Sequence, residues 1–211
     1  MTLPRTSRVI PVLFLATALG GCLGAAPPVP RDHFYRILVP PPQAEAVTFP
    51  GTVSVEPIEA QGLLRERPLL FSVGSAQEVQ QHDYHYWTDA PPRMLQLELV
   101  DYLRKGHAAS AVVTPDLRTP ADYEVSGRIK RLERILDGTP PRVVAELELA
   151  MTETGTNRLL VVQTYSAEIR AADDSVSASV EALDQALFDI FGRFVADAGK
   201  RYLAQRAARE G

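Results

Sequence analysis

The fold of this chain is decided by residues 142–170, which read RVVAELELAMTETGTNRLLVVQTYSAEIR. In both halves of this stretch apolar side chains alternate with polar ones, which is the period of a strand with one face in a core. The apolar positions are Val143, Ala145, Leu147, Leu149 and Met151, then Leu159, Val161, Tyr165, Ala167 and Ile169. The halves are joined by Thr154-Gly155-Thr156-Asn157, a short turn that contains glycine. We therefore predict an antiparallel β-hairpin here.

Shorter strands are expected on the N-terminal side of the hairpin. Stretches that are β-prone, or that alternate in the same way, lie at 33–39, 52–58, 69–71, 84–87, 111–113 and 123–129. Two Pro-rich stretches, 24–32 and 40–50, flank the first of them and are expected to be extended linkers.

Two segments have the helical period instead. The first covers 91–106 and ends at Gly106, with Thr88 or Asp89 as its expected capping residue. Its apolar stripe is Leu95, Leu99, Tyr102 and Leu103. The second covers about 175–205. The order of strands, helix, strands and long helix predicts a single α+β domain, in which a largely antiparallel sheet carries two main helices on one face.

The chain has one cysteine, Cys22, and the position of this residue indicates export. It closes the run Leu19-Gly20-Gly21-Cys22, behind two arginines and the apolar stretch 9–19. A basic start, a short apolar run and small residues at the end are the parts of a secretory signal. The apolar stretch is too short for a membrane span, which needs about 20 residues. The alternative is an ordinary cleaved signal in which the cysteine stands by chance.

Leucine three residues before the cysteine, followed by glycines, also resembles the lipobox of bacterial lipoproteins. This resemblance implies cleavage before Cys22, an S-diacylglycerol group on its sulfur and an N-acyl group on its new amino terminus. We expect no cofactor beyond these covalent groups. Leu23 stands where an acidic residue would favour inner-membrane retention, so we expect the periplasmic face of the outer membrane. The predicted domains are a signal peptide at 1–21, the acylated cysteine and tether at 22–32, and a folded domain at 33–207.

Charge limits the classes of partner. Removal of residues 1–21, which contain two arginines and no acid, changes the formal charge from −4 to −6. A nucleic-acid-binding protein needs a basic face, and this chain offers none, so we expect no nucleic acid partner. The rest of the chain is long enough for one domain with a sizeable core.

No catalytic residue and no metal site are predicted. The densest cluster of reactive side chains is the run from His82 to Trp87. On a strand, positions three apart point to opposite faces, so we expect that His82 and His85 do not converge. Only His33 and His107 remain as further imidazole ligands. The sequence has no Gly-x-Ser-x-Gly elbow, phosphate-binding glycine loop or dinucleotide fingerprint. A periplasmic hydrolase with an unrecognised site stays an alternative.

Five residues are candidate partner contacts: Leu63, Leu64, Tyr84, Tyr86 and Trp87. The two leucines stand among charged residues in an expected loop. On a strand the two tyrosines share one face, while His85 and Trp87 share the other. One pair is therefore expected to be exposed, and exposed Tyr and Trp are favoured at interfaces. For each of the five, packing in the core is the alternative.

The order of several short motifs adds a family resemblance. The motifs are Val53-Ser54-Val55-Glu56-Pro57, Gly62-Leu63-Leu64, Arg67-Pro68-Leu69-Leu70, and Tyr84 to Trp87 followed by Pro91-Pro92. In this order they resemble the ABC-type transport auxiliary lipoprotein family, the PqiC/YmbA-like group. The resemblance implies a non-enzymatic lipoprotein that works with an MCE-domain periplasmic protein and, through it, an ABC permease and ATPase.

Such systems are implicated in moving lipids or other hydrophobic molecules between the inner and outer membranes. A ring of identical copies around the conduit is a further expectation. The other interpretation is a structural lipoprotein of a different envelope assembly.

Overall fold

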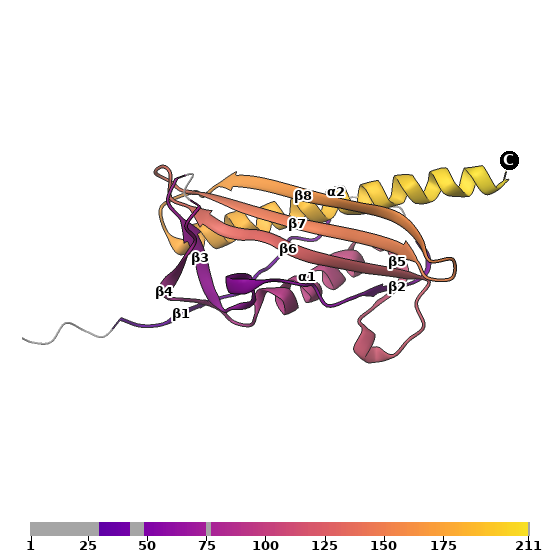
Figure 1. Ribbon diagram of the computed structural model, residues 1–211, viewed down its shortest axis with the longest axis horizontal. Coiled ribbons are helices and arrows are strands. Elements are labelled where there is room, and N and C mark those ends of the chain that lie inside the picture. Colours follow the sequence, from indigo (N-terminus) through magenta and orange to yellow (C-terminus); the bar gives the residue numbers. More distant parts are fainter. Residues whose placement is uncertain (1–29, 43–48, 75–76, 211) are drawn as a thin grey trace, which may run out of the picture. The chain divides into compact units, whose positions relative to one another are not determined.

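The computed structural model describes residues 30–42, 49–74 and 77–210. Residues 32–211 form one compact unit, and the elements below belong to it (Figure 1). The strands are β1 (His33–Tyr35), β2 (Phe49–Val55), β3 (Pro68–Ser72), β4 (Gln80–Trp87), β5 (Ala109–Val113), β6 (Tyr123–Ile135), β7 (Arg142–Glu153) and β8 (Arg158–Arg170). The helices are α1 (Pro91–Lys105) and α2 (Val176–Glu210), with short 3-10 turns η1 (Gly62–Arg65) and η2 (Pro115–Leu117). The predicted signal peptide, Cys22 and most of the predicted tether lie outside the described residues.

The predicted hairpin is confirmed as β7 and β8, which pair from Arg142 opposite Arg170 to Glu153 opposite Arg158. One detail of its alternation is wrong. Met151 pairs with Val161 but Thr152 pairs with Leu159, so β8 has one extra residue in a β-bulge. As a result Leu160 and Val161 are both buried, and Leu159 is exposed instead of facing the core.

The sheet is organised around β6. One edge of this strand pairs with β7 along most of its length. The other edge pairs with β2 at Tyr123–Val125 and with β3 at Glu133–Ile135, both in parallel. The sheet therefore divides into two arms, one of β2 and β5 and one of β3, β4 and β1.

The expectation of a largely antiparallel sheet is wrong, because the sheet is mixed. The pairings β1–β4, β2–β5, β2–β6 and β3–β6 are parallel, and only β3–β4, β6–β7 and β7–β8 are antiparallel. Antiparallel neighbours can be joined by a tight turn, whereas parallel ones need a long crossover connection. The sequence pattern therefore predicts antiparallel neighbours that a tight turn joins, and it does not indicate which strands pair in parallel.

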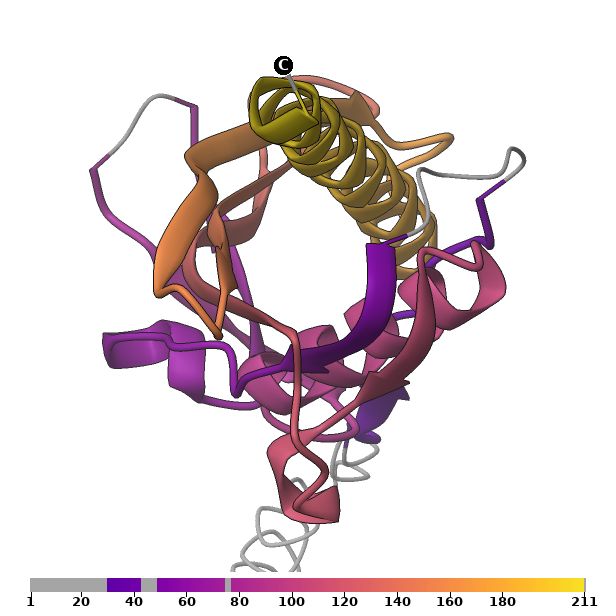
Figure 2. The same cartoon turned by 90° about the vertical axis from the view of Figure 1, so that its right-hand side faces the viewer.

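The sheet curls into a half-barrel, and α2 lies along its open side (Figure 2). The two helices meet at the Tyr102 ring of α1, which packs edge-on against Phe188 and Phe191 of α2. A single core fills the space between helices and sheet. Its largest fully buried side chains include Phe49, Tyr165, Phe191, Phe194, Leu95, Leu99, Leu147, Leu149 and Met151. None of the helices that the structure describes is long and apolar enough to cross a membrane.

Both expected helices are present, but the predicted side-chain cap of α1 is wrong. Its N-cap residue is Ala90, and Pro91 and Pro92 occupy the first turn, where an amide has no intrahelical partner. Asp89 instead accepts a hydrogen bond from the Ala90 amide and forms an ion pair with Arg93. Gly106 ends the helix as expected.

Candidate docking surfaces and anchoring segment

The segment after β1, residues 36–42, ties the start of the domain to both helices. Its Leu38 amide donates to Asp184 Oδ1 of α2, and its Val39 amide donates to Glu98 Oε2 of α1, both at 2.9 Å. Ile37 and Val39 are buried in the core. We refer to residues 36–42 as the strap. The stretch 33–39 was expected to be a strand throughout; only its first three residues are, since the strap bonds to carboxylates of the helices instead of to a strand.

The strap contains a pH-sensitive contact. Burial raises the pKa of Asp184 to about 6; the Leu38 amide opposes this rise, and the Glu98 and Glu181 carboxylates add to it. The pKa in the fold thus lies above the ordinary value of 3.8. Ionisation of Asp184 therefore costs stability as the pH rises from about 4 to about 6.

Asp184→Asn is expected to stabilise the protein at neutral pH. Asparagine does not ionise, and its Oδ1 can still accept the Leu38 amide. At pH 7.5 the variant should gain about 1 kcal/mol in free energy of unfolding, allowing for solvent screening of a partly exposed group. At pH 4 it should match the parent. Urea unfolding at the two pH values measures this, with Asp116→Asn, at an exposed acid of η2, as the control; an equal difference at both pH values would contradict the assignment.

The histidines of β4 meet, against the expectation from strand alternation. The ring of His85 stacks on His33 at 5.0 Å and lies edge-on to His82 at 5.4 Å. The reason is Tyr84, whose φ of 61° breaks the extended backbone. In addition, β4 has more residues between its paired positions Gln81 and Tyr86 than β3 has opposite them. Among the described residues, no group of three or more His, Cys, Asp or Glu side chains is placed to hold a metal ion.

Arg134 joins this histidine cluster to the start of α2. The residue is 5% exposed, and its guanidinium donates to Ser179 Oγ at 2.9 Å, to His82 Nε2 at 3.0 Å and to the Asp174 carbonyl at 3.0 Å. Burial, Arg134 and His85 lower the pKa of His82 to about 4, so that His82 is neutral at pH 7 and accepts this bond. Sequence reasoning missed Arg134, because its partners come from two segments that are distant in the chain, β4 and the start of α2.

The five candidate contact residues do not form one surface. Trp87 is 2% exposed and Leu64 packs against the core, so both serve packing. Leu63 is 42% exposed, in η1, which lies against α1 and β6. Tyr84 is also exposed and Tyr86 is half-buried. These two tyrosines lie in a different element from Leu63, the strand β4.

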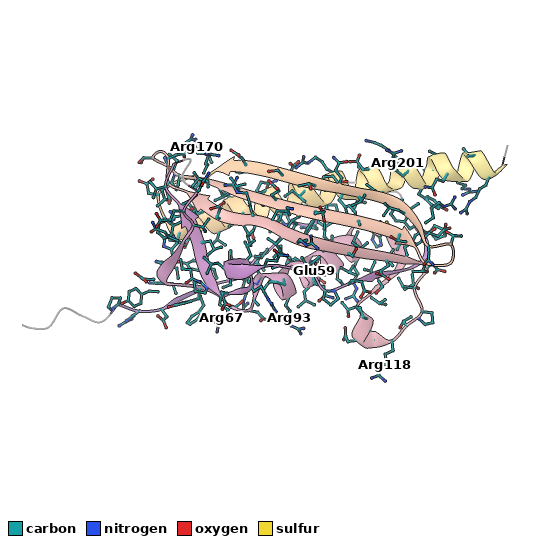
Figure 3. All side chains as sticks on the ribbon, viewed as in Figure 1. Glu59, Arg67, Arg93, Arg118, Arg170 and Arg201 are labelled. Atoms are coloured by element: carbon teal, nitrogen blue, oxygen red, sulfur yellow. The ribbon has the colours of Figure 1, made fainter. Side chains whose placement is uncertain are left out.

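An exposed aromatic side chain lies next to Tyr86. Phe34 of β1 pairs with Tyr86, and their ring centroids are 5.8 Å apart. The Arg67 guanidinium lies over the Phe34 ring at 5.5 Å, and its Nε donates to the Trp87 carbonyl. We call Phe34, Tyr84, Tyr86 and Arg67 the aromatic edge; Figure 3 shows Arg67 at the margin of the unit near β1 and β4.

The described residues enclose one small apolar cavity inside the half-barrel. An apolar cavity between β2, β5 and α2 has a volume of about 10 Å³ and is lined by side chains such as Phe49, Leu103 and Phe194. This is at the lower limit for a single water molecule and far below the space that an acyl chain needs.

The fold is similar to that of two solved structures. Protein XCC0632 from Xanthomonas campestris, a DUF330 protein, superposes with a TM-score of 0.73 at 17% identity, over 84% of this chain and 99% of that one. An uncharacterized protein superposes with a TM-score of 0.64 at 13% identity, over 79% of this chain and 97% of that one. At these identities the likeness concerns the fold alone. No curated protein matches the chain.

A protein-family model shows the family of the chain, which fold similarity alone does not show. The model of the ABC-type transport auxiliary lipoprotein component matches residues 35–191, from the end of β1 to near the middle of α2. The match includes the strap, both arms of the sheet and the hairpin, and it agrees with the motif order in the sequence. The chain therefore belongs to the ABC-type transport auxiliary lipoprotein component family.

Proposed function

We propose that this protein is an outer-membrane-anchored periplasmic lipoprotein, the non-catalytic docking component of an MCE-type ABC transport system for lipids or other hydrophobic molecules. The family match over residues 35–191 is the observation that carries the proposal. The lipobox pattern that ends at Cys22 and the neutral Leu23 support the anchor and the choice of membrane.

The physical need for such a component follows from the cargo. A lipid exposed to the aqueous periplasm has a free-energy cost of about 25 cal/mol for each Å² of apolar surface. A shielded conduit therefore requires a dock on the far membrane. An acyl anchor, a Pro-rich tether and a compact domain with a nearly filled core suit a dock better than a carrier.

We propose that Leu63 in η1 contacts the MCE-domain partner. Its side chain is exposed while its neighbour Leu64 packs on the core beneath it. The turn, which lies against α1 and β6, thus presents one apolar side chain to the outside. A side chain on a pre-ordered turn loses less conformational entropy when a partner binds.

Leu63→Asp is expected to weaken recovery of the MCE protein by about tenfold when the lipidated protein is pulled down from envelope extract. The matched control is Leu117→Asp in η2, which is 56% exposed and should leave recovery unchanged. Leu64→Asp should instead lower the thermal midpoint, because that side chain packs in the core. Undiminished recovery with Leu63→Asp would remove η1 from the interface. Recovery of other envelope proteins alone, even by the parent, would favour a structural lipoprotein of another assembly.

We also propose that several copies surround the conduit as a homo-oligomeric ring. A conduit with rotational symmetry favours a dock with the same symmetry. Light scattering of the purified lipidated protein in detergent measures the number of copies, and a monomer at all concentrations would contradict the ring.

A further inference from the structure

We infer that the aromatic edge, Phe34, Tyr84, Tyr86 and Arg67, lies on the phospholipid surface of the anchoring membrane, as a second and weaker membrane contact. This inference rests on the proposed lipid anchor at Cys22. It places one face of the domain on the bilayer and leaves other surfaces, including η1, for the transporter partner.

The position of β1 supports this assignment. It is the first described element after Cys22, and the chain from Cys22 to Phe34 can span at most about 40 Å. Among the described strands β1 pairs only with β4, so it is the end strand of its arm. Figure 1 shows it at the end of the unit opposite to the C-terminal end of α2. The anchor thus holds this edge at a high local concentration near the bilayer, where a weak affinity is sufficient.

The chemistry of the aromatic edge fits a headgroup region. Phe34 is 55% exposed although its ring already contacts Tyr86 and the Arg67 guanidinium. Aromatic rings are favoured at the membrane–water interface, and arginine is attracted to anionic headgroups. No ion pair joins Arg67 to an acid within the part of the chain that the structure describes.

Tyr84 adds an observation of backbone strain. Its φ of 61° is uncommon for any residue other than glycine, asparagine or aspartate, and an aromatic side chain is strained there. The side chain is 42% exposed, so burial in the core does not explain why this position holds tyrosine. A contact outside the domain does explain it.

The first test is flotation with vesicles of phosphatidylethanolamine and phosphatidylglycerol. The protein is the mature chain, residues 22–211 with Cys22→Ser, which contains the compact unit intact and has no acyl groups to mask weak binding. Phe34→Ser is expected to lower the bound fraction at least about fivefold, and Arg67→Gln about fivefold at low salt only. The control is Leu117→Ser, in the loop whose tip carries Arg118, well apart from Arg67 in Figure 3; it should bind like the parent.

The second variant separates binding from stability. Tyr84→Gly removes the aromatic ring and relieves the strain of a positive φ. It is expected to bind vesicles less than the parent while its thermal midpoint stays the same or rises. A residue retained for the fold alone would show the opposite pattern, a lower midpoint with unchanged binding.

Two results would overturn the inference. One is equal vesicle binding by the parent, Phe34→Ser and Tyr84→Gly. The other is unchanged vesicle binding together with loss of the MCE protein from pull-downs of the same variants, which would make the aromatic edge a protein interface. Because the vesicle test uses unacylated protein, its outcome is independent of whether Cys22 is acylated in the cell.

Discussion

Arg134→Ala is expected to lower the free energy of unfolding by about 3 kcal/mol, the largest effect of any substitution considered for the folded domain. The substitution removes three hydrogen bonds at once and leaves His82 Nε2, Ser179 Oγ and the Asp174 carbonyl without their donor. Buried polar groups that lose a partner have a full desolvation cost, which is why the effect exceeds that of an ordinary hydrogen bond. The start of α2 would also lose its connection to β6.

Urea unfolding at pH 7.5 measures this loss, with fluorescence of the single tryptophan, the buried Trp87, as the probe. Arg134→Lys should be intermediate at best, because an ammonium group cannot reach three acceptors that are arranged around a planar guanidinium. Arg128→Ala is the control: its ion pair with Glu59 is exposed, and the variant should unfold close to the parent. A parent-like midpoint for Arg134→Ala would show that the bonds of Arg134 are replaceable by water.

Cys22→Ser is expected to remove the protein from the outer-membrane fraction almost completely. Without the sulfur no diacylglycerol can be attached, and each methylene of an acyl chain contributes about 0.8 kcal/mol to membrane binding. The weak contact of the aromatic edge cannot replace several acyl chains. The variant should therefore fractionate as soluble periplasmic protein or as an unprocessed precursor, and it should fail to support transport.

The matched control for this experiment is Ser7→Ala, which changes a hydroxyl in the same leader and leaves the lipobox pattern unchanged. Circular dichroism should show that Cys22→Ser keeps the fold, since the compact unit begins at Asp32. Membrane fractionation equal to that of the parent would refute the lipid anchor, and with it the choice of the outer membrane.

Local sequence pattern predicted some strand pairings and missed others. The alternation of residues 142–170 predicted β7 and β8 with their turn, because pairing partners that are close in the chain share one period. The bulge at Leu160 was not predictable, since two apolar neighbours fit either face. The parallel pairings of β2 and β3 with one edge of β6 were also missed, because nothing local distinguishes which distant strand a short β-prone stretch joins.

The candidate contact residues were also predicted only in part. Strand alternation assigned His82 and His85 to opposite faces, and the positive φ of Tyr84 brought them together. The pattern could not separate buried Trp87 from exposed Tyr84, since both are aromatic residues of the same short strand. It also missed Phe34, whose exposure follows from its place on the end strand of the sheet.

By itself the sequence determined what depends on near neighbours: the hairpin, the two helices, the lipobox pattern around Cys22 and the motif order of the family. Only the tertiary structure decided which strands share an edge, where the strap is bound and which aromatic side chains stay outside. The bonds of Arg134 join residues 40 to 52 positions apart, and the strap bond to Asp184 joins residues 146 apart. Contacts at such separations leave no local period in the sequence, because they are selected by the packing of whole elements.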